Sequence, residues 1–118
     1  MKAIGFTRPL PVSNPEALLD INLPEPELRP HDILVAVQAV SVNPVDVKVR
    51  AAHTSAAGEY RVLGYDAAGI VQAVGSEVRN FKVGDEVYYA GALNRQGSNV
   101  QLQAVDARIA AKKPRSLD

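Results

Sequence analysis

The chain has 118 residues, of which 47% are hydrophobic, with 13 basic and 13 acidic side chains and no cysteine. This length suits one domain that can bury a core of its own. The formal net charge of zero excludes the basic surface that recruits nucleic acid or an anionic membrane. The absence of cysteine excludes disulfides and thiolate metal sites. Because no apolar run approaches the ~20 residues of a membrane span and no apolar signal core opens the chain, we expect a cytoplasmic protein without nucleic-acid or membrane partners.

Three strands are predicted in the first part of the chain. Residues 1–6 form a short apolar run, and residues 18–23 alternate apolar and polar side chains, as in a half-buried strand. Residues 32–42 are apolar on both faces, which is typical of a strand with a neighbour on each side. Prolines between the last two segments forbid a helix there. The pattern therefore indicates a sheet with residues 32–42 near its centre.

A short helix is predicted at residues 44–52. Asn43 is a favourable N-cap, and the proline that follows it suits the first helical position. Asp46 falls in the first turn, where negative charge is favoured, and Arg50 falls near the end, where positive charge is favoured. The small residues of 53–61 indicate a loop after this helix.

The segment 63–91, LGYDAAGIVQAVGSEVRNFKVGDEVYYAG, has the clearest strand pattern of the chain. Its two apolar runs, 67–74 and 86–90, are separated by turns that contain glycine, which predicts strands that fold back on each other. Gly69 lies inside the first run, where a glycine suggests a bulge or a close approach by another backbone or a ligand.

Two further strands are predicted at residues 99–104 and 108–111. Alternation in the first places Val100, Leu102 and Ala104 inward and Asn99, Gln101 and Gln103 outward. Many short strands with glycine and proline turns, and a single weak helix, indicate a mainly β domain built as a compact barrel or sandwich.

Three segments resemble one known family. Residues 64–91, GYDAAGIVQAVGSEVRNFKVGDEVYYAG, closely resemble the signature region of the medium-chain dehydrogenase/reductase superfamily. They are most similar to its quinone oxidoreductase-like, zinc-type alcohol dehydrogenase-like branch. SVNPVDVKVR at 41–50 and GSNVQLQAVDARIAAKKP at 97–114 resemble the same branch in the same order. The resemblance implies that the mainly β fold is a GroES-like, partly open β-barrel with one or two short helices.

Enzymes of this family carry a second, Rossmann-type domain, which binds the nicotinamide dinucleotide through a GxGxxG-type turn. Residues 1–118 contain neither such a glycine cluster nor the required alternation of strands and helices. We therefore expect residues 1–118 to be the substrate-side, catalytic domain of a larger enzyme whose nucleotide-binding domain is missing from this chain. The alternative is a stand-alone GroES-like binding or assembly module without enzymatic activity.

Zinc-dependent members of the family hold their catalytic zinc with a cysteine at one position and a His-Glu pair at another. The motif match places Asn43 at the first position and the pair Tyr65-Asp66 at the second. Asparagine is a poor zinc ligand and tyrosine an uncommon one, so no metal is expected. Without this Lewis acid, the resemblance implies hydride transfer from NAD(P)H to a quinone or an α,β-unsaturated carbonyl. NADP(H) is favoured over NAD(H), and the parent enzyme is expected to be a homodimer.

The resemblance also implies roles for individual residues. Asn43 is expected beside the nicotinamide as a cofactor contact, Tyr65 as the catalytic hydrogen-bond donor to a developing enolate oxygen, and Asp46, Arg50 and Asp66 in the substrate cleft. Each has a structural alternative. Asn43 suits a helix cap and Tyr65 a half-buried packing position, while Asp46 is an ordinary first-turn residue. A structural ion pair between Arg50 and Asp66 is favoured over catalysis by either of them.

Overall fold

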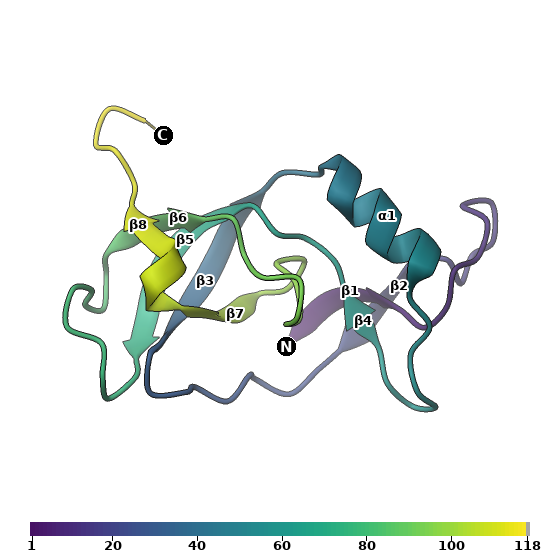
Figure 1. Cartoon of the computed structure of the whole chain (residues 1–118), viewed down its shortest axis with the longest axis horizontal. Helices are drawn as coiled ribbons and strands as arrows, with labels where there is room; N and C mark the ends of the chain where they lie inside the picture. Colours follow the sequence, from purple (N-terminus) through teal and green to yellow (C-terminus); the bar gives the residue numbers. More distant parts are fainter. Residues whose placement is uncertain (118) are drawn as a thin grey trace.

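A computed structural model describes residues 1–117, in which two antiparallel β-sheets lie side by side along the long axis of the molecule (Figure 1). The first sheet has the strand order β2-β1-β4. Its strands are β1 (Lys2–Phe6), β2 (Leu19–Asn22) and β4 (Arg61–Val62). The second sheet has the order β7-β3-β5-β6-β8. Its strands are β3 (Asp32–Val40), β5 (Ala67–Val74), β6 (Glu86–Tyr89), β7 (Leu102–Asp106) and β8 (Ala110–Lys112).

The main hydrophobic core cluster lies in the second sheet, while Phe6 and Val62 are buried in the first. As predicted, β3 has a neighbour on each side, because it pairs with both β5 and β7. The core cluster comes from these strands and the turns around them: Ile33, Val35, Ala67, Val71, Phe81, Val87, Tyr89, Val105 and Ala107. Gly69 on β5 confirms the predicted close approach, since a Cβ there would collide with the backbone oxygen of Ala36. The apolar pattern of the sequence thus becomes one continuous core around β3.

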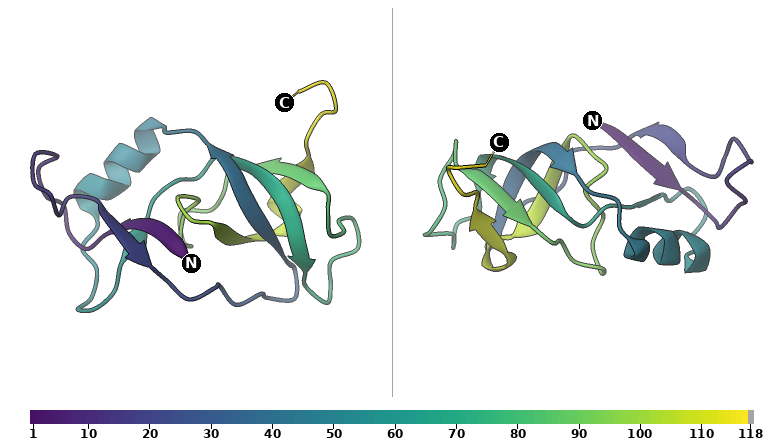
Figure 2. Two further views of the ribbon diagram at one scale, coloured as in Figure 1. Left: turned by 180° about the vertical axis from the view of Figure 1, so that it is seen from behind. Right: turned by 90° about the horizontal axis from the view of Figure 1, so that it is seen from above.

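The sheets do not close into a barrel, so the partly open architecture expected from the sequence is confirmed (Figure 2). They are joined where residues 99–101 cross to β1: Ala3 forms an isolated bridge with Val100, and the Ile4 N–H donates to the Asn99 carbonyl at 2.9 Å. The helix α1 (Pro44–Ala52) follows β3 and lies on the side of the first sheet. No helix within residues 1–117 is long and apolar enough to cross a membrane.

Most predicted elements are confirmed, with boundaries shifted by one to three residues, and the helix has the predicted bounds. The predicted strand 108–111 is wrong at its start, because residues Ala107–Ile109 form a 3-10 helix before β8. The Asp106 side chain accepts a hydrogen bond from the Arg108 N–H at 2.9 Å and so caps this turn. Strand β4 falls at the end of a segment predicted as loop.

Gln103 is the clearest error of the strand pattern. It was predicted to face outward, but it is buried, and the Tyr89 hydroxyl donates to its side-chain oxygen at 2.7 Å. Its side-chain nitrogen donates in turn to the Gln96 carbonyl at 3.1 Å. A glutamine that satisfies both ends of its amide can be buried without the cost of an unpaired polar group.

Candidate functional site

The end of β3, the start of α1 and the link between β4 and β5 meet at one rim of the domain. The Ser41 N–H donates to the Asp66 carbonyl oxygen at 3.2 Å, which brings the two segments together. The Asn43 side-chain nitrogen donates to Asp66 Oδ2 at 2.9 Å, and the Ser41 hydroxyl donates to the same oxygen at 3.3 Å. Asn43 and Asp66, which are far apart in the sequence, are therefore direct neighbours. We call Ser41, Asn43, Asp46 and Asp66 the rim cluster.

Asp46 connects the start of α1 to the segment before β5 through two hydrogen bonds. It is buried, with 6% of its surface exposed, and both of its carboxylate oxygens accept backbone hydrogen bonds. Oδ2 accepts from the Asn43 N–H at 2.8 Å, and Oδ1 accepts from the Gly64 N–H at 2.8 Å. The first bond caps the helix and the second ties it to the link before β5. These two contacts favour the structural alternative for Asp46.

Arg50 does not form the expected ion pair with Asp66. Its guanidinium donates to the Leu10 carbonyl oxygen at 2.6 Å, which ties the helix to the N-terminal loop. The predicted pair is therefore wrong, because the helix places Arg50 against the N-terminal loop. The Asp66 carboxylate instead accepts hydrogen bonds from two neutral donors, the Asn43 amide and the Ser41 hydroxyl.

Tyr65 is enclosed by residues that lie far from it in the sequence. Only 4% of its surface is exposed, so it is more deeply buried than a half-buried strand position. The Arg61 guanidinium donates to its hydroxyl oxygen at 3.2 Å and to the Leu93 carbonyl oxygen at 2.6 Å. Gly91, with φ of 68°, packs against the Tyr65 backbone, where a Cβ would lie 2.7 Å from the carbonyl oxygen. Sequence reasoning missed Arg61, because it lay in a presumed loop.

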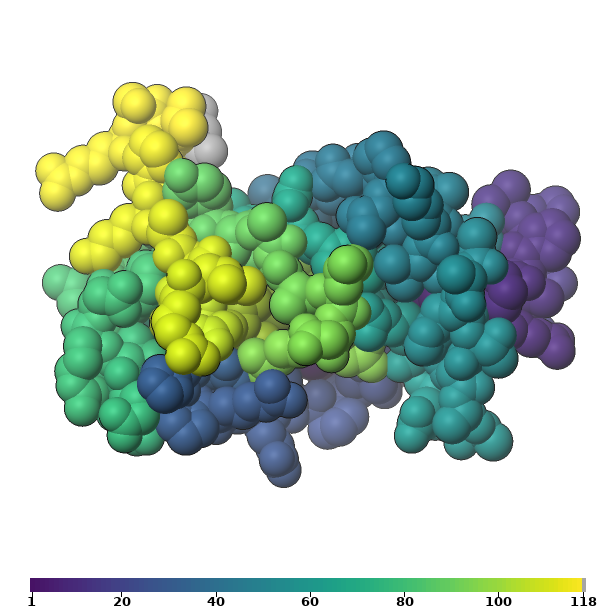
Figure 3. Space-filling model, viewed as in Figure 1, coloured from purple at the N-terminus to yellow at the C-terminus, as the bar shows by residue number. Residues whose placement is uncertain are grey.

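Residues 91–98, which we call the clasp, fasten this part of the molecule; they are the bright green segment at the front of Figure 3. The Gln96 side chain accepts from the Val62 N–H at 2.8 Å and donates to the Tyr60 carbonyl at 2.7 Å. It thereby pairs with the free edge of β4 much as a neighbouring strand would. The clasp thus binds the segment that carries Arg61 and Tyr65.

A bidentate ion pair anchors the clasp to β3. The Arg95 guanidinium donates to the Asp32 carboxylate at 2.8 and 2.7 Å, and Asp32 is only 2% exposed. Burial acts to raise the pKa of Asp32, but hydrogen bonds from Arg95 and from the Arg29 N–H outweigh it and hold that pKa below its usual value. The carboxylate is therefore charged and paired in the folded protein.

The start of α1 has few free N–H groups to offer a phosphate. Helix N-termini bind phosphates through free backbone N–H groups, but the Asn43 N–H is bonded to Asp46 and Pro44 has none. Two of the N–H positions at this helix start are therefore not free to bind a phosphate.

Zinc does not fit the donor set at this rim. Among the residues that the structure describes, no three His, Cys, Asp or Glu side chains gather as a metal site. The Asn43 nitrogen is a hydrogen-bond donor to Asp66, the Tyr65 oxygen faces a guanidinium, and both Asp46 oxygens are bonded to N–H groups. Zinc favours Cys, His and free carboxylate ligands. In this site, the polar atoms of these side chains form hydrogen bonds in place of bonds to a metal cation.

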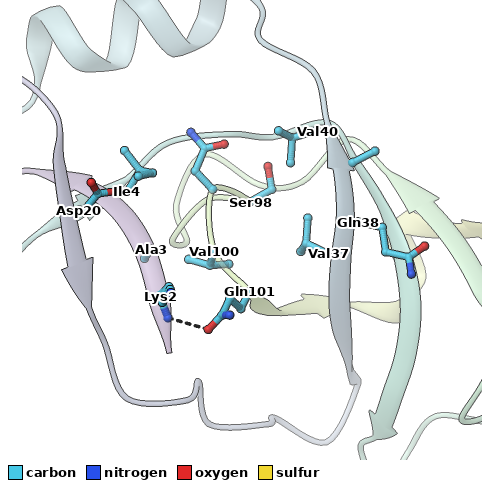
Figure 4. Close-up of a pocket in the computed structure, with 12 residues that line it drawn as sticks. Lys2, Ala3, Ile4, Asp20, Val37, Gln38, Val40, Ser98, Val100 and Gln101 are labelled. Atoms are coloured by element: carbon cyan, nitrogen blue, oxygen red, sulfur yellow. Dashed lines mark hydrogen bonds between the residues drawn. The ribbon is translucent and has the colours of Figure 1, made fainter.

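Two cavities lie elsewhere in the domain. One of about 330 Å³ opens between β1 and β3, where the Lys2 N–H donates to the Gln101 side chain at 2.8 Å (Figure 4). Another of about 500 Å³ lies between residues 23–29 and the clasp. Neither is lined by Asn43, Tyr65 or Asp66. The rim cluster is therefore separate from both of these cavities.

Several known proteins are similar to this chain in sequence and fold. Residues 29–113 match the alcohol dehydrogenase GroES-like domain. A zinc-type alcohol dehydrogenase-like protein of Staphylococcus aureus is 44% identical over 117 residues, which are 99% of this chain and 34% of that protein. A Rhizobium etli structure, assigned provisionally to the zinc-dependent alcohol dehydrogenases, is 52% identical with a TM-score of 0.95, covering 100% of this chain and 34% of that one.

A quinone oxidoreductase of Escherichia coli, solved in complex with NADPH, is 28% identical with a TM-score of 0.85. The alignment covers 100% of this chain and 35% of that structure. The chain thus spans about a third of the length of these relatives, 34% in the case of the S. aureus protein. The family model, these relatives and the two-sheet fold agree: the chain belongs to the alcohol dehydrogenase GroES-like domain family of the medium-chain dehydrogenase/reductase superfamily.

Proposed function

We propose that this chain is the substrate-side domain of an NAD(P)H-dependent oxidoreductase that reduces a quinone or an α,β-unsaturated carbonyl without zinc. The observation that carries the proposal is the rim cluster, in which Asn43 and Ser41 donate hydrogen bonds to the Asp66 carboxylate. The membership of the family supports the oxidoreductase class. The E. coli quinone oxidoreductase bound to NADPH supports this substrate and NADP(H) over NAD(H). The share of the relatives that the chain covers supports a second, nucleotide-binding domain in the whole protein, which we propose is a homodimer.

The nicotinamide cofactor, when bound, supplies a hydride, that is, a proton together with two electrons, to the acceptor. With an α,β-unsaturated carbonyl, the hydride adds to the β-carbon, the carbon–carbon π pair shifts toward the carbonyl, and negative charge develops on the oxygen. A proton must then reach the α-carbon, and water is its source. The task left to this domain is to orient the acceptor and to donate a hydrogen bond to its oxygen.

The residues of this chain divide that task. Asn43, fixed at the start of α1 by its bond to Asp66, is proposed to contact the carboxamide end of the cofactor and so to set the face it presents. Tyr65 is proposed to donate its hydroxyl hydrogen to the acceptor oxygen. Asp66 holds Asn43 in place and borders the substrate cleft. These roles do not need a metal.

The experiment is a substrate panel with the full-length protein. NADPH oxidation is followed with quinones, with α,β-unsaturated ketones and aldehydes, and with saturated alcohols plus NADP⁺ in the reverse direction. We expect turnover with the electron-poor acceptors and none with simple alcohols. The Asn43→Ala variant should raise KM for NADPH, with Asn80→Ala, at an exposed turn, as its control. Efficient alcohol oxidation, with no reduction of any quinone or enone, would contradict the proposal.

A further inference from the structure

We propose that Arg61 is a positioning residue that orients and polarises the Tyr65 hydroxyl, so that the tyrosine delivers a cation-assisted hydrogen bond to the oxygen of the substrate. The catalytic consequence rests on the proposed function, but the Arg61–Tyr65 pairing stands on its own contacts. Neither the family match nor the sequence pattern assigns a role to Arg61. Its side chain lies on β4, the strand that the sequence analysis missed.

The direction of the hydrogen bond follows from the chemistry of the two groups. A guanidinium has donors and no acceptor, so the 3.2 Å contact uses the Tyr65 oxygen as the acceptor. The phenolic hydrogen must then point elsewhere. None of residues 1–117 accepts a hydrogen bond from this hydroxyl. Arg61 therefore fixes the oxygen and leaves the hydrogen to be donated to another molecule or another part of the protein.

Arg61 is itself held rigidly enough to impose this direction. The same nitrogen that contacts Tyr65 donates to the Leu93 carbonyl oxygen at 2.6 Å, which ties the guanidinium to the clasp. Its Nε is buried and has no partner among the described residues, so the guanidinium is partly shielded from solvent, although its contact with Leu93 is exposed. A cation in such surroundings acts more strongly on its neighbour than one in water. Gly91 closes the other side of Tyr65 by packing against its backbone.

When a charged group donates a hydrogen bond to the phenolic oxygen, the hydroxyl becomes a stronger hydrogen-bond donor through its own hydrogen. Hydrogen bonds that involve an ionised group are about twice as strong as neutral ones, and linked hydrogen bonds polarise one another. The ligand that suits such a donor is an oxygen on which negative charge grows during the reaction, namely the carbonyl oxygen of a quinone or an enone. Arg61 thus supplies, through Tyr65, positive charge that a zinc ion supplies directly in metal-dependent relatives.

The pairing is tested first without any reaction. In full-length protein labelled with ¹³C at the tyrosine Cζ, the Tyr65→Phe variant identifies the Tyr65 resonance. We expect Arg61→Gln to move this resonance and Arg61→Lys, which keeps the charge, to restore it in part. Arg79→Gln is the matched control, because Arg79 also donates to a backbone carbonyl, that of Ser76 at 2.8 Å, but is exposed and remote from Tyr65. An unmoved Tyr65 resonance in folded Arg61→Gln protein overturns the proposal.

The catalytic consequence is tested by a double-mutant cycle. Loss of one donor to a developing oxyanion costs about 10²–10³ in kcat, and weakening that donor should cost less, on the order of tenfold. Arg61→Gln should therefore lower kcat with little change in KM for NADPH, and should have no further effect in the Tyr65→Phe background. An equal effect in both backgrounds overturns the action through Tyr65. If the wild-type protein reduces no quinone or enone, the proposed function fails, while the resonance still decides the pairing.

Discussion

The two sheets are stabilised by different interactions. The second sheet is stabilised by apolar packing around β3, where Ile33 and Val35 are completely buried. The β4 side of the first sheet also buries Phe6 and Val62, but it and the adjoining rim are in addition fastened by side chains bonded to backbone, through Gln96 and Asp46. Apolar packing fixes a fold but tolerates small shifts of each group, whereas directional hydrogen bonds fix the position of single atoms. The site lies on the side that is held directionally.

Truncation in the apolar sheet should have the largest effect. Ile33→Ala removes buried methyl groups from the centre of the core and should lower the free energy of unfolding by about 4 kcal/mol, within the range for large-to-small core substitutions. Chemical denaturation measures this loss. The control is Val83→Ala, at a side chain that is 63% exposed, which should change stability by no more than about 0.5 kcal/mol. Similar losses in both variants would contradict the assignment of the core.

Breaking the anchor of the clasp should cost somewhat less. Arg95→Met keeps much of the side-chain volume but leaves the Asp32 carboxylate buried without its cation, which should cost about 3 kcal/mol at neutral pH. Arg108→Met is the control, since Arg108 is largely exposed and forms its ion pair with Asp106 at the 3-10 turn. A loss no larger than that of the control would show that the clasp is held by other contacts.

The same pair predicts a pH dependence. The pKa of Asp32 is held below its ordinary value of 3.8, so folding favours the ionised carboxylate. Its contribution to stability is therefore fully present above that ordinary value and is lost as the pH falls through the lowered folded value. Urea titrations across this acidic range should show the difference between wild type and Arg95→Met shrinking as the pH falls. A difference that stays constant would sink the linkage.

The rim should respond to loss of Asp46 by a smaller amount. Asp46→Asn keeps one acceptor oxygen but turns an amide group toward a backbone N–H, so the variant should lose about 2 kcal/mol. Hydrogen exchange should be faster at the Asn43 or the Gly64 amide, whichever loses its acceptor oxygen. Asp20→Asn, at an exposed position on β2, is the control. Unchanged protection of both amides would contradict the structural role of Asp46.

The smallest effect on stability is expected at Asp66. Because Arg50 bonds to Leu10 and not to Asp66, Asp66→Asn leaves no buried cation unpaired. Its half-buried contacts with Asn43 and Ser41 involve neutral donors, so the loss should stay near 1 kcal/mol or below. Thermal melts measure the loss, and KM for NADPH reports whether Asn43 has moved. A loss of several kcal/mol would restore the ion pair that the sequence suggested.

The sequence predicted those features of the fold that depend on local pattern. The period-two runs located most strands, and Asn43-Pro44 with Asp46 located the helix, because capping and alternation are properties of neighbouring residues. The partners of Arg50, Gln103 and Arg61 could not be predicted in this way. Each is bonded to a segment far along the chain, and a polar side chain gives no sign of which distant carbonyl or hydroxyl it will meet.

We propose that the rim cluster works by hydrogen bonds and not through zinc. The direct measurement compares zinc content with NADPH-dependent quinone or enone reduction in full-length protein before and after treatment with a chelator. We expect that protein with far less than one zinc per chain keeps full activity, and that added zinc does not raise it. Activity that disappears on chelation and returns in proportion to the zinc bound would contradict a zinc-free site.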